Sequence, residues 1–278
     1  MLTHSTISQT TGVTPTQPRA VRPLIAALSL AWREIIRFLR QRHRVFGALG
    51  QPIIFWLLFG TGLGSLKLDY AYFFPGTLVM ILLFTAIFTT ISIIEDRREG
   101  FLQSVLVAPQ PRWAMVLGKI LGGSLIAMVQ GLVFLLLGLT LGLKPELPMV
   151  AAIVAFLFVV SVALTGLGFV FAWRLDSSQG FHAIMSVVLF PMWLLSGAFF
   201  PASDGVLGWL VRLNPLTYGV AGLRHLLYWG ASDEVRAAAL PEGLPSLTVC
   251  VIVTVAFAVV TFALSCQAAR ERTSGDLL

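Results

Sequence analysis

The chain has 278 residues, of which 57% are hydrophobic and only 12% are charged, and its formal net charge is +6. A soluble domain carries about 25% charged residues, so this composition excludes an ordinary soluble protein. The mean hydropathy of +0.87 points instead to a protein embedded in a membrane.

Six long stretches contain no Asp, Glu, Lys or Arg and are rich in Leu, Val, Ile, Phe and Gly. They cover residues 45–66, 70–94, 120–143, 147–173, 177–203 and 243–269. A hydrocarbon core roughly 30 Å thick needs about 20 apolar residues in a helix. Because each span must satisfy its own backbone hydrogen bonds in lipid, the sequence predicts an all-α polytopic membrane protein with six transmembrane helices over residues 45–278.

The N-terminal region has two parts. Residues 1–23 are polar and rich in Ser, Thr, Gln and Pro, so we expect a disordered cytoplasmic tail. Residues 24–44 follow a helical period, with an apolar stripe beside a stripe of Arg33, Arg37, Arg40 and Arg44. This pattern is typical of a helix that lies in the headgroup plane and predicts an amphipathic interface helix. A plain basic anchor and a surface that also touches a cytoplasmic partner both remain open.

The basic residues also predict the orientation. Residues 1–44 contain seven arginines and one acidic residue, so this segment alone accounts for the net charge. Short basic segments stay cytoplasmic, which places both termini inside when there are six spans. Topology and attraction to anionic lipid headgroups explain the basic charge, so we expect no nucleic-acid partner and a contact with membrane lipid.

The most charged segment of the chain follows the second span. Its charged residues are Glu95, Asp96, Arg97, Arg98 and Glu99. After Gly100, helical spacing places four apolar side chains on one face of a short helix that Pro109 ends. The four are Phe101, Leu102, Val105 and Leu106. Such a helix favours docking into a groove of another protein, and an ordinary connecting loop is the alternative.

A segment of 46 residues, 201–246, separates the fifth and sixth spans and is longer than a plain loop should be. It holds two apolar helical runs that Asn214 and Pro215 interrupt, and Tyr218 follows the break. This pattern predicts a re-entrant or interfacial hairpin on the outer side. An aromatic anchor at the membrane surface is the alternative.

The sequence lacks the motifs that are typical of several other classes of function. No Gly-x-x-x-x-Gly-Lys-Ser/Thr sequence occurs, so we expect no ATP or Mg²⁺ site in this chain. His182 and Ser196 lie roughly 21 Å apart on one predicted helix, too far for a catalytic pair. The sequence contains no cluster of His, Cys and Glu residues that would predict a metal site. The spans hold no charged residue at mid-depth, which disfavours an ion-coupled carrier. A secondary transporter or passive channel remains the alternative function.

Two segments resemble the permease subunit of type-2 ATP-binding-cassette transporters, the ABC-2 exporter family. The first is the charged-then-apolar run 95–109, which leads to Leu-Gly-Lys at 117–119. The second is Ser-Gly-x-x-Phe-Pro at 196–201, followed by Asn-Pro-x-x-Tyr at 214–218 and Leu-Arg at 223–224. The second series is the more specific. One departure is Ala221, where the family often has Asp, so no role of that carboxylate carries over.

The resemblance implies the permease subunit of an ATP-driven exporter in the plasma membrane, the inner membrane of a bacterium. Two permease copies, identical or paralogous, would form the pathway between them, and a separate cassette ATPase subunit would bind ATP and Mg²⁺. The helix over 24–44 would be the interface helix, and 98–107 the coupling helix on the ATPase. The outer hairpin would include Pro201 and Arg224. Our candidates for apolar pathway contacts on spans 2 and 5 are Phe84, Phe88, Met192 and Phe199.

Overall fold

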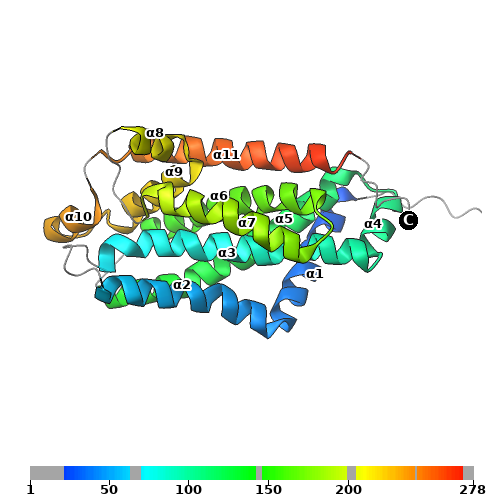
Figure 1. Cartoon of the computed structure of the whole chain (residues 1–278), viewed down its shortest axis with the longest axis horizontal. Helices are drawn as coiled ribbons and strands as arrows, with labels where there is room; N and C mark the ends of the chain where they lie inside the picture. The colour runs from blue at the N-terminus through cyan, green and yellow to red at the C-terminus, as the bar shows by residue number, and fades with distance from the viewer. Residues whose placement is uncertain (1–21, 63–69, 142–145, 199–204, 242, 272–278) are drawn as a thin grey trace, which may run out of the picture.

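The computed structural model describes residues 22–62, 70–141, 146–198, 205–241 and 243–271, and these residues form helices and no strands. Besides α2 (Arg42–Gly62), five long helices run along the long axis of the molecule (Figure 1). They are α3 (Tyr70–Arg98), α5 (Arg112–Leu135), α6 (Leu147–Arg174), α7 (Ser178–Trp193) and α11 (Leu247–Ala268). With the turns that extend α5 and α7, all five are long and apolar enough to cross a membrane.

The first expected span, 45–66, falls largely on α2 (Arg42–Gly62), which packs against α3. This helix is not one of the five that meet the length and hydropathy of a span within the described residues. The all-helical fold is therefore confirmed for the described residues, and the first expected span, 45–66, stays a prediction. Most of the expected tail, together with Phe199 and Pro201, lies outside the described residues.

Helix α3 forms the centre of the bundle. Its side chains Leu78, Ile81 and Leu82 are fully buried, and it packs against α2, α5, α6 and α7. Small residues bring the neighbouring helices close, because a Cβ atom on Gly123 of α5 would lie 2.8 Å from the Thr89 hydroxyl. The second expected span is thus the one most enclosed by protein.

Short helices cover the two ends of the bundle (Figure 1). At one end, called the α4 end, α1 (Pro23–Arg40) crosses the bundle near α4 (Phe101–Val107). At the other, called the α10 end, are α8 (Val206–Leu213), α9 (Pro215–Leu227) and α10 (Asp233–Ala239). A 3₁₀ turn, η2 (Leu136–Leu141), extends α5, and a π-helical turn, η3 (Leu194–Ala198), extends α7.

The expected continuous helix over 24–44 is wrong at its C-terminal end. Gln41 has non-helical dihedral angles (φ −95°, ψ 72°) and separates α1 from α2. The chain turns there, from crossing the bundle to running along it (Figure 1). Arg44 therefore belongs to the first turn of α2, whereas Arg33, Arg37 and Arg40 lie on α1.

Candidate functional site

One face of α1 packs closely on α5 at the α4 end. Ala27 and Ala31 are buried there, opposite Gly118 and Gly122. A Cβ atom on Gly118 would lie 2.6 Å from the Ala27 carbonyl oxygen, and one on Gly122 would lie 2.9 Å from that of Ala31. The small side chains of these alanines and glycines thus allow the backbones of α1 and α5 to pack in direct contact.

We expect Gly118→Val to displace α1 from α5, because the contacted atom belongs to rigid backbone and cannot yield. The apparent melting temperature of the purified protein should fall by several degrees, as overpacking costs about 1–3 kcal/mol. Limited proteolysis should cleave α1 faster. Gly47→Val is the matched control, since a Cβ at Gly47 meets nothing within 4 Å. Equal melting temperatures for the two variants would contradict the close packing of α1.

A buried group of charged side chains joins α1, α3 and α5 beside this contact. The Lys119 ammonium lies 2.7 Å from Glu34 Oε1, contacts Asp96 Oδ2, and lies 3.3 Å from the Ser92 hydroxyl. Arg33 donates to both oxygens of Asp96, at 2.8 and 3.1 Å. Glu34, Asp96 and Lys119 are all buried. Such charges are tolerated away from water only when they are paired and hydrogen-bonded.

The same group continues toward the surface. Arg37 donates to Glu95 at 2.8 Å, to Asp96, and to Glu99 at 3.4 Å. Arg44 reaches Glu95 from the start of α2. Three members of the predicted arginine stripe, Arg33, Arg37 and Arg44, are therefore paired with the acidic residues of the predicted coupling segment. Arg40 is exposed and forms no ion pair within the described ranges. We call Arg33, Glu34, Arg37, Arg44, Glu95, Asp96 and Lys119 the charge cluster.

Sequence reasoning missed the core of this cluster. A single acid, Glu34, in a basic helix and a lysine, Lys119, at the start of an apolar span were the available signals. Neither identifies its partner, because Glu34 and Lys119 are 85 residues apart in the chain.

Helix α4 is fixed to its own chain more firmly than its sequence pattern predicts. Gly100 turns the chain from α3 into α4 with a φ of +75°, a conformation that favours glycine. Leu102 is 2% exposed and belongs to the core, while Val105 and Leu106 pack partly against it. The Arg33 guanidinium lies 3.6 Å from the centre of the Phe101 ring. Leu102 is therefore removed from the expected docking face because it has no surface left for a partner, and docking through the rest of α4 stays a prediction.

The remaining surface of α4 and its connections are exposed. Val107 is 83% exposed, and Ser104 and Pro109 are exposed as well. Arg98 donates to the Asp176 carbonyl oxygen at 3.1 and 2.7 Å, so it ties the end of α3 to the connection between α6 and α7. The end of α3 that leads into α4 is therefore attached to the connection between α6 and α7.

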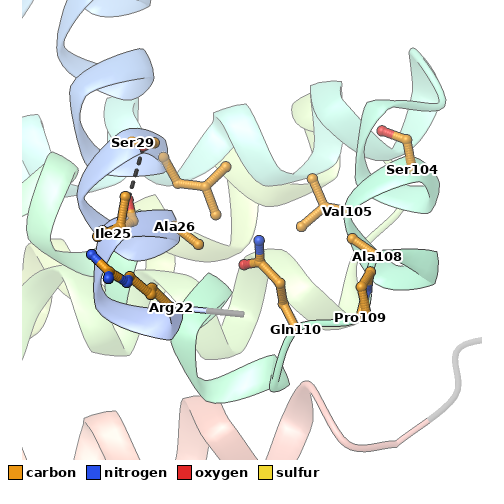
Figure 2. A pocket seen from close by; sticks show the side chains of 10 residues that line it. Arg22, Ile25, Ala26, Ser29, Ser104, Val105, Ala108, Pro109 and Gln110 are labelled. Carbon is orange, nitrogen blue, oxygen red and sulfur yellow. Dashed lines mark hydrogen bonds between the residues drawn. The ribbon is translucent and has the colours of Figure 1, made fainter. Parts of the chain in front are cut away.

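A groove of about 910 Å³ separates the start of α1 from the end of α4. Figure 2 shows Ile25 and Ala26 of α1 facing Val105, Ala108 and Gln110 across it. Arg22 is its one charged lining residue. The α4 end thus offers a recessed surface of mixed polar and apolar character.

At the α10 end, Arg224 is a fully buried cation. It donates to the Gly197 carbonyl at 3.0 Å and to the Ala239 carbonyl at 2.7 Å, and it lies 4.1 Å from the centre of the Tyr72 ring. Within the part of the chain that the structure describes, no carboxylate pairs with it. Burial lowers the pKa of this guanidinium. Gly197 has a φ of +73°, which lets the chain leave its helical path within η3.

Asn214 joins the predicted hairpin to the end of α7. Its side-chain oxygen accepts from the Leu216 amide at 3.0 Å and caps α9, and its side-chain amide donates to the Met192 carbonyl. Pro215 occupies the first turn of α9, where its missing N–H costs nothing. The Tyr218 hydroxyl donates to the Arg212 carbonyl of α8 at 2.9 Å. The Asn-Pro break is thus a rigid corner between α8 and α9.

A third feature is an apolar hollow of about 490 Å³ between α3 and α7. Phe84 and Phe88 of α3 line it opposite Met185 and Phe190, and His182 lies edge-on to Phe88 at 5.8 Å. Two of the four candidate pathway residues therefore share one hollow. Met192 is half-buried against the core instead.

Comparisons with known proteins identify the family to which the sequence is similar. Residues 26–228 match the sequence profile described as ABC-2 type transporter. The chain is 27% identical over 210 residues to the putative transport permease ycf38 of Cyanophora paradoxa, which covers 71% of this chain and 72% of the relative. It is 25% identical over 226 residues to the daunorubicin resistance ABC transporter permease protein DrrB1 of Streptomyces coeruleorubidus, with 76% and 78% covered. It is also 25% identical over 160 residues to the probable multidrug ABC transporter permease YbhR of Escherichia coli (strain K12), with 55% and 42% covered.

Proposed function

The chain belongs to the ABC-2 type transporter family as a transmembrane permease, and we propose that it is the permease subunit of an ATP-driven exporter. Two permease copies form the pathway, and a separate cassette ATPase subunit binds ATP and Mg²⁺. This family membership confirms the resemblance found in the sequence.

The proposed orientation places the α4 end in the cytoplasm of a bacterial cell, with α2 as the first of six spans and both termini inside. The arginine-rich start of the chain supports it, because short basic segments are retained on the cytoplasmic side. The α8–α9–α10 segment then covers the outer end as a partly embedded hairpin. Asn214 and Arg224 fix the hairpin to the end of α7 through their hydrogen bonds. These bonds support the proposal that the hairpin moves as a unit.

The observation that carries the proposal is the attachment of α4. Arg33 covers Phe101, Gly100 joins α4 directly to α3, and Arg98 holds the connection between α6 and α7. A partner that pushes on α4 therefore moves α3, at the centre of the bundle, instead of deforming a loose loop. Packed side chains, hydrogen bonds and rigid helices are the structural means by which coupling between distant sites is carried, and this attachment supports such a role for α4.

The hollow between α3 and α7 supports an apolar cargo path between the two copies. Its volume of about 490 Å³ is within the range of small-molecule sites. Phe84, Phe88 and Phe190 provide aromatic walls, which suit lipophilic molecules. Two of the relatives carry daunorubicin resistance and probable multidrug transport in their names, and we infer a lipophilic, drug-sized cargo for this chain.

The test uses one exposed valine from each end of the bundle. Val107 of α4 is 83% exposed and Val206 of α8 is 80% exposed, so an aspartate at either site should leave the fold intact. In proteoliposomes with the cassette ATPase that co-purifies with the wild-type chain, we expect Val107→Asp to lower permease-stimulated ATP hydrolysis at least about tenfold, because a charge enters a desolvated interface. Val206→Asp should retain the wild-type rate.

Phe101→Asp is a less clean test, because the Phe101 ring lies under Arg33 and its loss also disturbs the charge cluster. The proposal fails if the wild-type chain captures no cassette ATPase. It also fails if Val107→Asp stimulates hydrolysis as the wild type does.

A further inference from the structure

The surface of α1 that faces away from α5 holds a basic hollow that the contacts described above do not fill. Its volume is about 530 Å³, and its lining residues are Trp32, Arg33, Ile36, Arg37, Arg40 and Gln41. Three of these six side chains are guanidinium groups and none is a carboxylate. We call this surface the α1 hollow.

The arginines of the α1 hollow differ in how they are held. Arg33 makes three hydrogen bonds to carboxylates, and Arg37 likewise makes three. A guanidinium group carries five N–H donors, so both retain donors while their positions are fixed. Arg40 is exposed and forms no ion pair with the described residues. The hollow therefore combines two preorganised cations with one that no carboxylate of the described residues pairs.

An exposed apolar stripe runs along α1 beside the hollow. Leu28, Trp32 and Leu39 are 62%, 64% and 59% exposed. A ligand that covers both surfaces needs an anionic head and an apolar body. A phospholipid has both, whereas a free nucleotide or a phosphopeptide leaves the stripe in water. Guanidinium groups suit the head because their planar donors match phosphate oxygens.

We propose that the α1 hollow binds the headgroup phosphate of an anionic phospholipid of the cytoplasmic leaflet, with its acyl chains along Leu28, Trp32 and Leu39. This proposal rests on the proposed orientation, which puts α1 at the inner surface of the membrane, where anionic lipids attract basic residues. A bound phosphate would lie next to Arg33 and Arg37, so the lipid would stabilise the charge cluster that positions α4.

The test is native mass spectrometry of the delipidated full-length protein, titrated with dioleoylphosphatidylglycerol or dioleoylphosphatidylcholine. We expect the wild type to prefer phosphatidylglycerol. Arg40→Gln should weaken that binding about fivefold, the effect of one arginine near an anionic headgroup, and should leave phosphatidylcholine binding unchanged. Arg40→Lys should lie between the two, because it keeps the charge and loses the planar donors. Arg236→Gln, an exposed arginine of α10, is the matched control.

Equal binding of the two lipids, or unchanged phosphatidylglycerol binding by Arg40→Gln, overturns the proposal. If Arg40→Gln keeps its lipid binding and loses capture of the ATPase, the hollow is a partner contact instead. Complete displacement of phosphatidylglycerol by millimolar inorganic phosphate also overturns the proposal, because the hollow is then a plain anion site. Failure of lipid binding leaves the exporter assignment standing, because the Val107→Asp experiment tests that assignment separately.

Discussion

Lys119→Met should lower the stability of the permease markedly. The substitution removes the cation that Glu34 and Asp96 share inside the bundle. Removal of one partner from a buried ion pair costs about 3–5 kcal/mol. We expect the lower end of that range, about 3 kcal/mol, because Arg33 still pairs with both carboxylates. The free energy of unfolding, measured by SDS titration in mixed micelles, gives the value directly.

A double-mutant cycle with Glu34→Gln separates the lost pair from lost packing. Glu34→Gln removes one of the two carboxylates that Lys119→Met leaves without its ammonium partner, so the double variant should lose less stability than the sum of the two single variants. We expect a coupling energy of about 1 kcal/mol or more, as for residues in one ionic network. Strictly additive effects, or a wild-type free energy for Lys119→Met, would show that the charge cluster does not hold α1 to the bundle.

Arg224→Met should loosen the outer hairpin. The change leaves the carbonyl oxygens of Gly197 and Ala239 without their donor, and each unsatisfied group costs about 1–3 kcal/mol. Loss of the buried charge offsets part of this destabilisation. We therefore expect a larger effect on local opening of the hairpin than on the global free energy of unfolding. We expect the amides of α10 to exchange hydrogen at least about tenfold faster, which corresponds to a loss of about 1.4 kcal/mol in opening free energy.

Arg224→Lys and Arg236→Met serve as controls for this prediction. A lysine at 224 keeps the charge, but its single ammonium lacks the two-pronged geometry that serves both carbonyls, so exchange should be intermediate. Arg236 is exposed on α10 itself, and its loss should change nothing. If α10 exchanges at the wild-type rate in Arg224→Met, then Arg224 is not the tether of the hairpin.

Local patterns in the sequence were sufficient to predict the membrane helices, two of the breaks between helices and the family of this protein. Charge-free stretches of 22 or more residues predict membrane helices because hydrocarbon admits few other structures. The break between α8 and α9 at Asn214 and Pro215, and the turn at Gly100, follow from the conformational limits of those residues. The family could be recognised for the same reason, since its motifs are short and contiguous.

What only the tertiary structure decided is which distant residues meet. The pair of Arg33 and Asp96 spans 63 residues, and that of Arg98 and Asp176 spans 78. No helical period encodes such pairs, because they depend on how α1, α3 and α6 cross. The same packing buries Leu102, which a one-helix projection places on a docking face. It also buries Arg224, although arginine side chains are mostly exposed in proteins. A residue's period fixes its face on a helix, but the neighbouring helices determine whether that face meets protein, lipid or water.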